Sequence, residues 1–211
     1  MVDLILMAVI LLNLSLLGGR MLKGCISRAA LQGFLTALFG IAVHSGSVSG
    51  RLVGLALMAM IAKAAVFPWL LSRAMRATEV TEERNPFLGV SISMILGITL
   101  VAAGFFLGRL FPVASHEISR LAMPVSYATM FSGLLLIIAR RTVLFQAIGY
   151  LVLENGIYIA GITLVSGLPF LVELGVLLDV IAAVLVMVVV VQQIDRESNG
   201  NEEDPLSELK G

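Results

Sequence analysis

Very little of this sequence is charged, and it holds few residues that could bind a metal. Only 13% of its 211 residues are Asp, Glu, Lys or Arg, whereas 59% are apolar. The one cysteine, Cys25, excludes an internal disulfide and a cysteine-ligated iron–sulfur cluster. No P-loop, dinucleotide-binding fingerprint, CxxC or HExxH motif is present, which argues against the common soluble enzyme classes. With a mean hydropathy of +1.02, the chain is expected to be a polytopic membrane protein.

Apolar segments long enough to cross a bilayer recur along the chain, and a helical crossing needs about 20 residues. They show no alternation of the kind found in barrel strands, so each is predicted to be a helix. The second is the weakest, because it is short and contains Gln32. The fold class predicted is an all-α integral membrane protein with seven transmembrane helices: Val2–Leu17, Ala29–Ser45, Leu52–Leu71, Pro86–Leu107, Ile118–Ala139, Val143–Ser166 and Phe170–Gln193.

The Lys and Arg residues of the predicted loops give the orientation. Three of them fall on one side: Arg51, Arg109 and Arg120. Ten fall on the other: Arg20, Lys23, Arg28, Arg73, Arg76, Arg84, Arg140, Arg141, Arg196 and Lys210. This bias predicts an outside N-terminus and a cytoplasmic C-terminus. Because no Lys or Arg precedes the apolar run Leu4–Leu17, we expect a retained span there rather than a signal peptide.

The order of apolar and polar stretches predicts two similar units. Spans one to three and spans five to seven both end on an apolar run with a central ionisable residue, which suggests a parallel internal repeat. We therefore expect an N-terminal three-helix unit at 1–75 and a second three-helix unit at 118–194. A linker helix with its flanking loops would occupy 76–117, and a polar cytoplasmic tail 195–211.

Three ionisable residues lie near the middle of predicted spans: Lys63, Glu154 and Asp179. A charge at the centre of a membrane helix costs about 2.5–3.5 kcal/mol on insertion scales, which suggests a function. One interpretation is a proton or ion relay, with Glu154 and Asp179 as carriers and Lys63 as their electrostatic modulator. The other is that Lys63 pairs with Glu154 or Asp179 and only holds helices together.

Further polar residues surround Glu154. Gln146, Tyr150, Glu154 and Tyr158 are spaced four apart and so share one helix face, and Asn155 follows Glu154 directly. Such a stripe can carry a proton through hydroxyls, amides and trapped water, although its tyrosines can equally be core residues. Glu173 is expected nearer the outer surface, where a solvated carboxylate is the simpler interpretation.

Pro68 follows Lys63 by five residues in the run KAAVFPWLL. A proline inside a helix kinks it and leaves a carbonyl without its usual partner. The kink can be mere geometry, but charged residues beside broken helices also form ion-coupling sites in transporters.

Two runs, RRTVLFQAIGYLVLENGIYIAGI and LVELGVLLDVIAAVLVMVV, together with the ending SELKG, carry a resemblance. The region from Ile118 to Gly211 resembles the K-type subunit of respiratory complex I. Nearly the whole chain resembles the hydrogenase-4 component E family, where the YxxxENG step, the LVELGxxxD run and the element matched by Lys63 and Pro68 recur. Members of that family are membrane subunits of formate hydrogenlyase-type group 4 [NiFe] hydrogenases.

This resemblance implies a noncatalytic subunit in the membrane arm of a complex I-like oxidoreductase. Its partners would be antiporter-like membrane subunits, and a peripheral hydrogenase module that contacts it only indirectly. The [NiFe] and iron–sulfur centres would lie in those partners, with no cofactor or metal in this chain. Glu154 and Asp179 would belong to a hydrophilic axis that moves protons or Na⁺. The location implied is a bacterial or archaeal plasma (inner) membrane.

Two departures from the K-type pattern affect that path. Glu154 is displaced by about one helical turn, with apolar Leu151 at the matching position, and Asp179 stands in place of a glutamate. Alternatives remain. The region Arg140–Gln193 is also similar to the C subunit of Mrp-type multisubunit Na⁺/H⁺ antiporters, although that subunit has only three spans. A purely structural membrane anchor is a second alternative. A seven-helix receptor is disfavoured by the very short loops.

Overall fold

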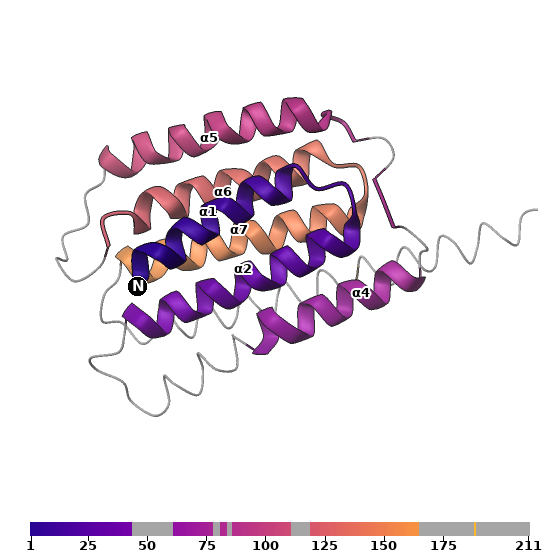
Figure 1. The fold of residues 1–211 in the computed structure, drawn as a ribbon, viewed down its shortest axis with the longest axis horizontal. Coiled ribbons are helices and arrows are strands. Elements are labelled where there is room, and N and C mark those ends of the chain that lie inside the picture. Colours follow the sequence, from indigo (N-terminus) through magenta and orange to yellow (C-terminus); the bar gives the residue numbers. More distant parts are fainter. Residues whose placement is uncertain (44–60, 78–80, 84–85, 111–118, 165–187, 189–211) are drawn as a thin grey trace, which may run out of the picture.

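The computed structural model describes residues 1–43, 61–77, 81–83, 86–110, 119–164 and 188 (Figure 1). In this part of the chain the fold is all-helical and contains no strand. The elements are α1 (Val2–Leu17), α2 (Leu22–Val43), the π-helical segment η1 (Ala62–Val66), α4 (Phe67–Ala77), α5 (Val90–Leu110), α6 (Ala122–Ala139) and α7 (Val143–Leu164).

The centre of the bundle is formed by α1, α2, α6 and α7 (Figure 1). Helices α6 and α7 pack along their length, α2 lies against α7, and α1 contacts both α2 and α6. Helix α5 covers one side of this group by contacts with α6 and α1, whereas η1 and α4 pack against α2 on the opposite side. Because α2 packs against both η1 and α7, residues of η1 lie close to the buried face of α7.

Four of the described helices are long and apolar enough to cross a membrane: α2, α5, α6 and α7. Helix α1 is apolar but has only 16 residues. The chain is thus a multi-pass, all-helical membrane protein by helix length and composition. The seventh predicted span, Phe170–Gln193, lies outside the described residues except for Val188, and so does the part of the third predicted span that precedes Ile61.

The helix ends agree best with the predictions where a glycine or a pair of arginines marks them in the sequence. Helix α1 ends at Leu17, where the amide of Gly18 bonds to the carbonyl of Leu14. Helices α6 and α7 end and begin on either side of the pair Arg140–Arg141, as predicted.

The predicted start of the second span at Ala29 was wrong. Helix α2 begins at Leu22, so its first two turns carry Lys23, Cys25 and Arg28. Cys25 falls between the first two predicted spans, but it is a buried helix residue. Lys23 and Ser27 are exposed, and Ser27 donates to the carbonyl of Lys23, whereas Arg28 donates to the Ser15 hydroxyl of α1. These turns therefore resemble a loop only in sequence.

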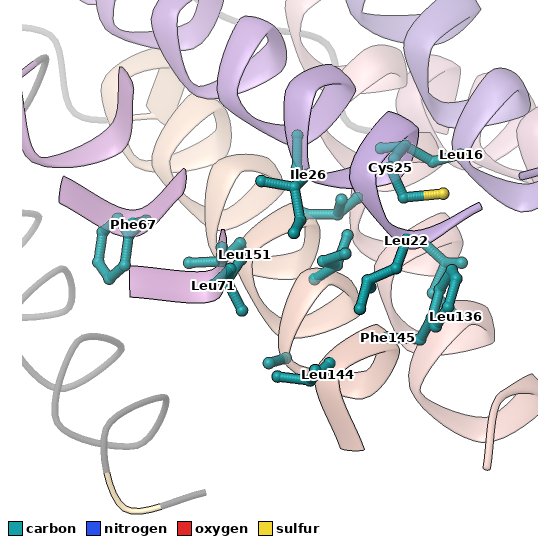
Figure 2. Close-up of a cluster of buried hydrophobic side chains, with 14 of the residues drawn as sticks. Leu16, Leu22, Cys25, Ile26, Phe67, Leu71, Leu136, Leu144, Phe145 and Leu151 are labelled. Carbon is teal, nitrogen blue, oxygen red and sulfur yellow. The ribbon is translucent and has the colours of Figure 1, made fainter. Parts of the chain in front are cut away.

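Figure 2 shows the larger core cluster, in which side chains of α2, α4, α6 and α7 meet. Helix α4 is amphipathic and turns Phe67, Leu71 and Ala74 into this cluster. Its opposite face leaves Trp69 exposed with Arg73 5.7 Å from the ring centroid. An aromatic residue with arginines on an outward face is typical of a helix near a membrane–water interface.

Glycines bring α5 and α6 into close contact. A Cβ at Gly104 would lie 2.6 Å from the backbone nitrogen of Ala128, and one at Gly108 would lie 2.6 Å from that of Pro124. Small residues spaced four apart allow such backbone approach, which is a common way to associate helices in lipid. The rest of α5 is largely exposed in this chain, including Ile95 and Phe106.

At one end of the bundle, the segment around Glu83 closes the helix termini; we call its contacts the Glu83 clamp. Glu83 Oε2 is 3.1 Å from Arg140 Nη1, and its Oε1 accepts hydrogen bonds from the amides of Arg141 and Thr142. Arg140 also donates to the carbonyl of Leu17 at 2.7 Å. The clamp therefore joins the end of α1 to the start of α7, where the carboxylate accepts hydrogen bonds from two amides just before the helix.

The clamp changes how Arg140 is understood. In the orientation argument it was counted among loop charges, but both Arg140 and Glu83 are 1% exposed. Arg20, which was counted on the same side, nevertheless lies at this end, because its carbonyl accepts a hydrogen bond from the amide of Glu83.

Candidate functional site

The most unusual feature of the bundle is a buried ion pair between Lys63 and Glu154. Lys63 Nζ lies 2.7 Å from Glu154 Oε1, and the two residues are 5% and 3% exposed. They come from η1 and α7, which are 91 residues apart in the chain. An ammonium and a carboxylate are kept in an apolar interior only when they neutralise each other.

Lys63 stands in a π-helical segment, Ala62–Val66, directly before α4. Pro68 has no amide hydrogen, so it cannot donate to the carbonyl of Ala64, and its ring crowds that carbonyl. The chain widens locally into a π-helical turn at this point, and such turns are frequent at functional sites. The irregularity predicted from Pro68 is present, as a π-helical segment around Lys63.

Asn155 contacts the ammonium, and Thr36 contacts Asn155. Lys63 Nζ donates to Asn155 Oδ1 at 3.2 Å, and the Thr36 hydroxyl lies 3.2 Å from the same oxygen. Because an ammonium only donates, Lys63 fixes the oxygen of the Asn155 amide toward itself. Gly33 allows α2 to come this close, since a Cβ there would lie 2.9 Å from Lys63 Cβ.

The ring of Tyr158 lies under the lysine, with its centroid 4.8 Å from Lys63 Nζ. A cation over an aromatic face is stabilised by the ring quadrupole, most strongly where water is excluded. Lys63, Glu154, Asn155, Thr36 and Tyr158 thus form one polar group, which we call the ion-pair cluster.

A small cavity borders the ion-pair cluster between α2, α4 and α7. It measures about 10 Å³ for the centre of a water molecule. Its walls are Ile26, Ala29, Ala30, Gly33, Lys63, Phe67, Pro68, Leu71, Leu151, Glu154 and Asn155. Glu154 Oε2 is buried and has no hydrogen-bond partner among the described residues.

A second polar group, the amide cluster, joins three helices without any charge. Gln32 on α2 donates to Asn13 Oδ1 on α1, and Asn13 Nδ2 donates to Thr129 Oγ1 on α6 at 2.9 Å. The Thr129 hydroxyl itself donates to the carbonyl of Val125. Gln32, which made the second span look weak, therefore holds helices together.

The predicted polar stripe on α7 is divided in the structure. Glu154 and Tyr158 belong to the ion-pair cluster, whereas Gln146 donates to the carbonyl of Arg140 near the helix start. Tyr150 is half-buried against the apolar core and makes no hydrogen bond to the described residues. No hydrogen-bonded chain along α7 links Gln146 to Glu154 in this part of the molecule.

Two predicted site residues, Asp179 and Glu173, lie outside the described residues. In the part of the chain that is described, no three His, Cys, Asp or Glu side chains are grouped as metal ligands would be.

Sequence reasoning missed Thr36, Asn13 and Thr129 in the membrane and Glu83 at its edge. Isolated Thr and Asn residues in apolar helices are a usable signal, because polar side chains in membranes turn toward partner helices. For Glu83 the only signal in the sequence was an acidic residue in a predicted loop. Which of Glu154 and Asp179 pairs with Lys63 was left open, and the structure brings Glu154 to it.

The fold and these clusters define an all-helical, multi-pass membrane protein that buries a lysine–carboxylate pair. The chain is 33% identical over 161 residues to "Uncharacterized protein Rv0085" of Mycobacterium tuberculosis, covering 75% of this chain and 71% of that protein. It therefore belongs to the same family as that protein.

The chain is also a distant homologue of hydrogenase-4 component E. Identity to the Escherichia coli and Shigella flexneri proteins is 28% over 153 residues, covering 72% of this chain and 71% of each relative. No family model matches the sequence. No solved structure matches it either.

Proposed function

We propose that this protein is a noncatalytic membrane subunit of an energy-converting, complex I-like hydrogenase of the formate hydrogenlyase type. Its homology to hydrogenase-4 component E supports a place in such a complex. The single observation that carries a role in coupling is the buried Lys63–Glu154 pair, with one carboxylate oxygen left unpartnered.

In this proposal, Glu154 takes up and releases a proton while Lys63 shifts the balance between its two forms. Burial disfavours a charged carboxylate and a neighbouring cation favours it, so a change in either one moves the proton. Asp179 is proposed as a second carrier. Redox turnover in a partner module would drive the exchange, and the [NiFe] and iron–sulfur centres would lie in that module.

The arrangement in the membrane is part of the same proposal. Seven spans would place the N-terminus outside and the tail 195–211 in the cytoplasm, in the plasma (inner) membrane of a bacterium or archaeon. Arg20, Arg140 and Arg141 lie together at the Glu83 clamp, and this group of basic residues supports the cytoplasmic assignment of that end. Residues 1–75 and 118–194 would form two three-helix units, the second like the complex I K-type subunit, with 76–117 between them. Antiporter-like subunits would be the membrane partners.

Two experiments test this function. Purification of the tagged chain from its native membrane in mild detergent should recover a [NiFe] hydrogenase large subunit with it, as mass spectrometry would show. Recovery of antiporter subunits alone would replace the proposal with a Mrp-type Na⁺/H⁺ antiporter.

The second experiment compares Glu154→Gln with Glu82→Gln in the assembled complex. Glu82 is a half-exposed carboxylate 4.0 Å from Arg20 and serves as the matched control. We expect the Glu154 variant to assemble but to lose most coupled proton translocation, and the Glu82 variant to behave as wild type. The close Lys63–Glu154 contact also favours a purely structural anchor, and unchanged coupling in Glu154→Gln would select that alternative.

A further inference from the structure

The Lys63 ammonium is held by oxygen atoms of two neighbouring side chains of α7. Its Nζ lies 2.7 Å from Glu154 Oε1 and 3.2 Å from Asn155 Oδ1. The Thr36 hydroxyl on α2 lies 3.2 Å from the same Asn155 oxygen and adds a third oxygen to the group. Carboxylate and amide oxygens are also the ligands that hard metal cations take in proteins. The ammonium therefore occupies a place where a metal cation could be held, and we call this place the cation position.

The charge around the cation position matches a single monovalent cation. Among the described residues, Lys63 and Glu154 are the only charged side chains in the wall of the cavity between α2, α4 and α7. Both are buried, so the carboxylate needs one positive charge beside it when it is ionised. Lys63 supplies that charge from a side chain fixed to η1. The ammonium and a free Na⁺ or K⁺ cannot occupy the cation position at the same time.

Packing holds the lysine side chain in the cation position. A Cβ at Gly33 would lie 2.9 Å from Lys63 Cβ, so α2 packs directly on the base of the side chain. The ring centroid of Tyr158 on α7 lies 4.8 Å from Nζ. Lys63 itself lies in the π-helical segment, and irregular helices are also where transporters hold their coupling cations. In this bundle the side chain of a lysine fills such a place.

We infer that Lys63 determines ion specificity: its ammonium fills a monovalent-cation site formed by Glu154 and Asn155, and it thereby keeps Na⁺ and K⁺ away from the carboxylate. A metal ion would have to displace a charge that is fixed to the chain, whereas a proton needs no such space. This is specificity by exclusion of the wrong ion. The cation site stands on the geometry alone, whereas the transport of H⁺ rather than Na⁺ rests on the proposed function.

The first test uses two variants that remove the same charge. Lys63→Ala also vacates the space against Glu154 Oε1 and Asn155 Oδ1, whereas Lys63→Met keeps most of the side-chain volume. We expect NaCl, compared with choline chloride at equal ionic strength, to raise the melting temperature of the purified Lys63→Ala chain by a few degrees, as expected when sodium exceeds its dissociation constant about tenfold. Wild type, Lys63→Met and the double variant Lys63→Ala with Glu154→Gln should show no such rise.

Two outcomes of this test would overturn the cation site. One is a Lys63→Ala melting temperature that is the same in NaCl and choline chloride, and the other is an equal rise in wild type. Should Lys63→Ala be too unstable to melt in choline chloride, its folded yield in size-exclusion chromatography should be higher when NaCl is present throughout purification. Equal yields in the two salts would overturn the site in that case.

The second test measures proton translocation by the assembled complex in proteoliposomes. We expect the wild-type rate to be the same in NaCl and in choline chloride. A wild-type complex that needs sodium, or that transports radioactive sodium, would overturn the inference, while the proposed function in ion translocation would stand. If Glu154→Gln leaves translocation unchanged, the proposed function fails and the choice of ion fails with it, and the melting temperatures of the Lys63 variants alone decide the cation site.

Discussion

Two buried ion pairs in this bundle differ in what surrounds them. In the Glu83 clamp both carboxylate oxygens are engaged, one by Arg140 Nη1 and the other by two backbone amides. In the ion-pair cluster, Glu154 uses one oxygen for Lys63 and leaves the other unpartnered beside a cavity of about 10 Å³. The buried atom left without a partner among the described residues is therefore on the cation in the clamp, Arg140 Nε, and on the carboxylate in the ion-pair cluster, Glu154 Oε2.

The cations differ as well. An arginine side chain does not lose its proton in a protein, whereas a buried lysine can. The Arg140–Glu83 pair therefore always keeps the charge of its arginine, whereas lysine and glutamate side chains both have a neutral form. The comparison teaches that burial of a charge pair alone does not indicate transport. In the proposed function, the unpartnered oxygen of Glu154 and a cation that can be neutralised distinguish the ion-pair cluster from the clamp.

The largest effect should follow from breaking the clamp. Glu83→Ala leaves Arg140 buried without its counter-charge and removes two bonds from the start of α7. Loss of one partner of a buried pair costs about 3–5 kcal/mol. We expect little folded protein in size-exclusion chromatography of detergent extracts, with Glu82→Ala as the control that folds normally. A wild-type yield and melting temperature in Glu83→Ala would show that the clamp does not stabilise the fold.

A smaller loss of stability should follow from Lys63→Met. The stranded Glu154 can take up a proton and become neutral, so the fold should lose only about 1–3 kcal/mol, the cost of an unsatisfied buried polar group. Thermal unfolding of the purified variant would measure it.

A double variant sharpens the contrast between the pairs. Lys63→Met with Glu154→Gln should melt nearer the wild type than Lys63→Met alone, because no charge remains. The melting temperature of Glu83→Gln with Arg140→Met should stay low. The neutral side-chain amide of Gln is a weaker acceptor than a carboxylate for the backbone amides of Arg141 and Thr142. Equal recovery of the melting temperature in both double variants would mean that the two pairs stabilise the fold in the same way.

The smallest effect should come from the amide cluster, which holds no charge. Gln32→Leu removes one interhelical hydrogen bond and also the buried Oε1 of Gln32, which has no partner among the described residues. Interhelical hydrogen bonds in membranes are worth about 0.6 kcal/mol on average, so the melting temperature should fall only slightly. Coupled activity should stay unchanged, and a strong loss of coupling would assign the amide cluster to the proton route instead.

The sequence predicted much of this fold, because membrane helices are specified by local composition. The ends at Leu17, Ala139 and Val143 follow from adjacent glycines or the arginine pair. The start of α2 could not be predicted in the same way. Helix α2 extends beyond its apolar part, and Lys23 and Arg28 in that extension resemble loop residues in the sequence.

The candidate site was predictable in its members and not in its pairing. Lys63, Glu154 and Asn155 attract attention because polar groups in apolar segments are costly. Their mutual contact depends on how α2 and α7 pack against η1, which Gly33 and the π-helical turn decide. Glu83 could not be found, because a loop carboxylate becomes structural only when the helix ends meet around it.

The most direct measurement of the central claim is infrared difference spectroscopy of the purified complex, recorded between its oxidised and hydrogen-reduced states. A carboxyl group that gains or loses a proton shows a C=O band that shifts in D₂O. We expect such a band in wild type and in Glu82→Gln, and its disappearance in Glu154→Gln. A wild-type spectrum without the band, or one that Glu154→Gln leaves unchanged, would contradict a proton on Glu154 during turnover.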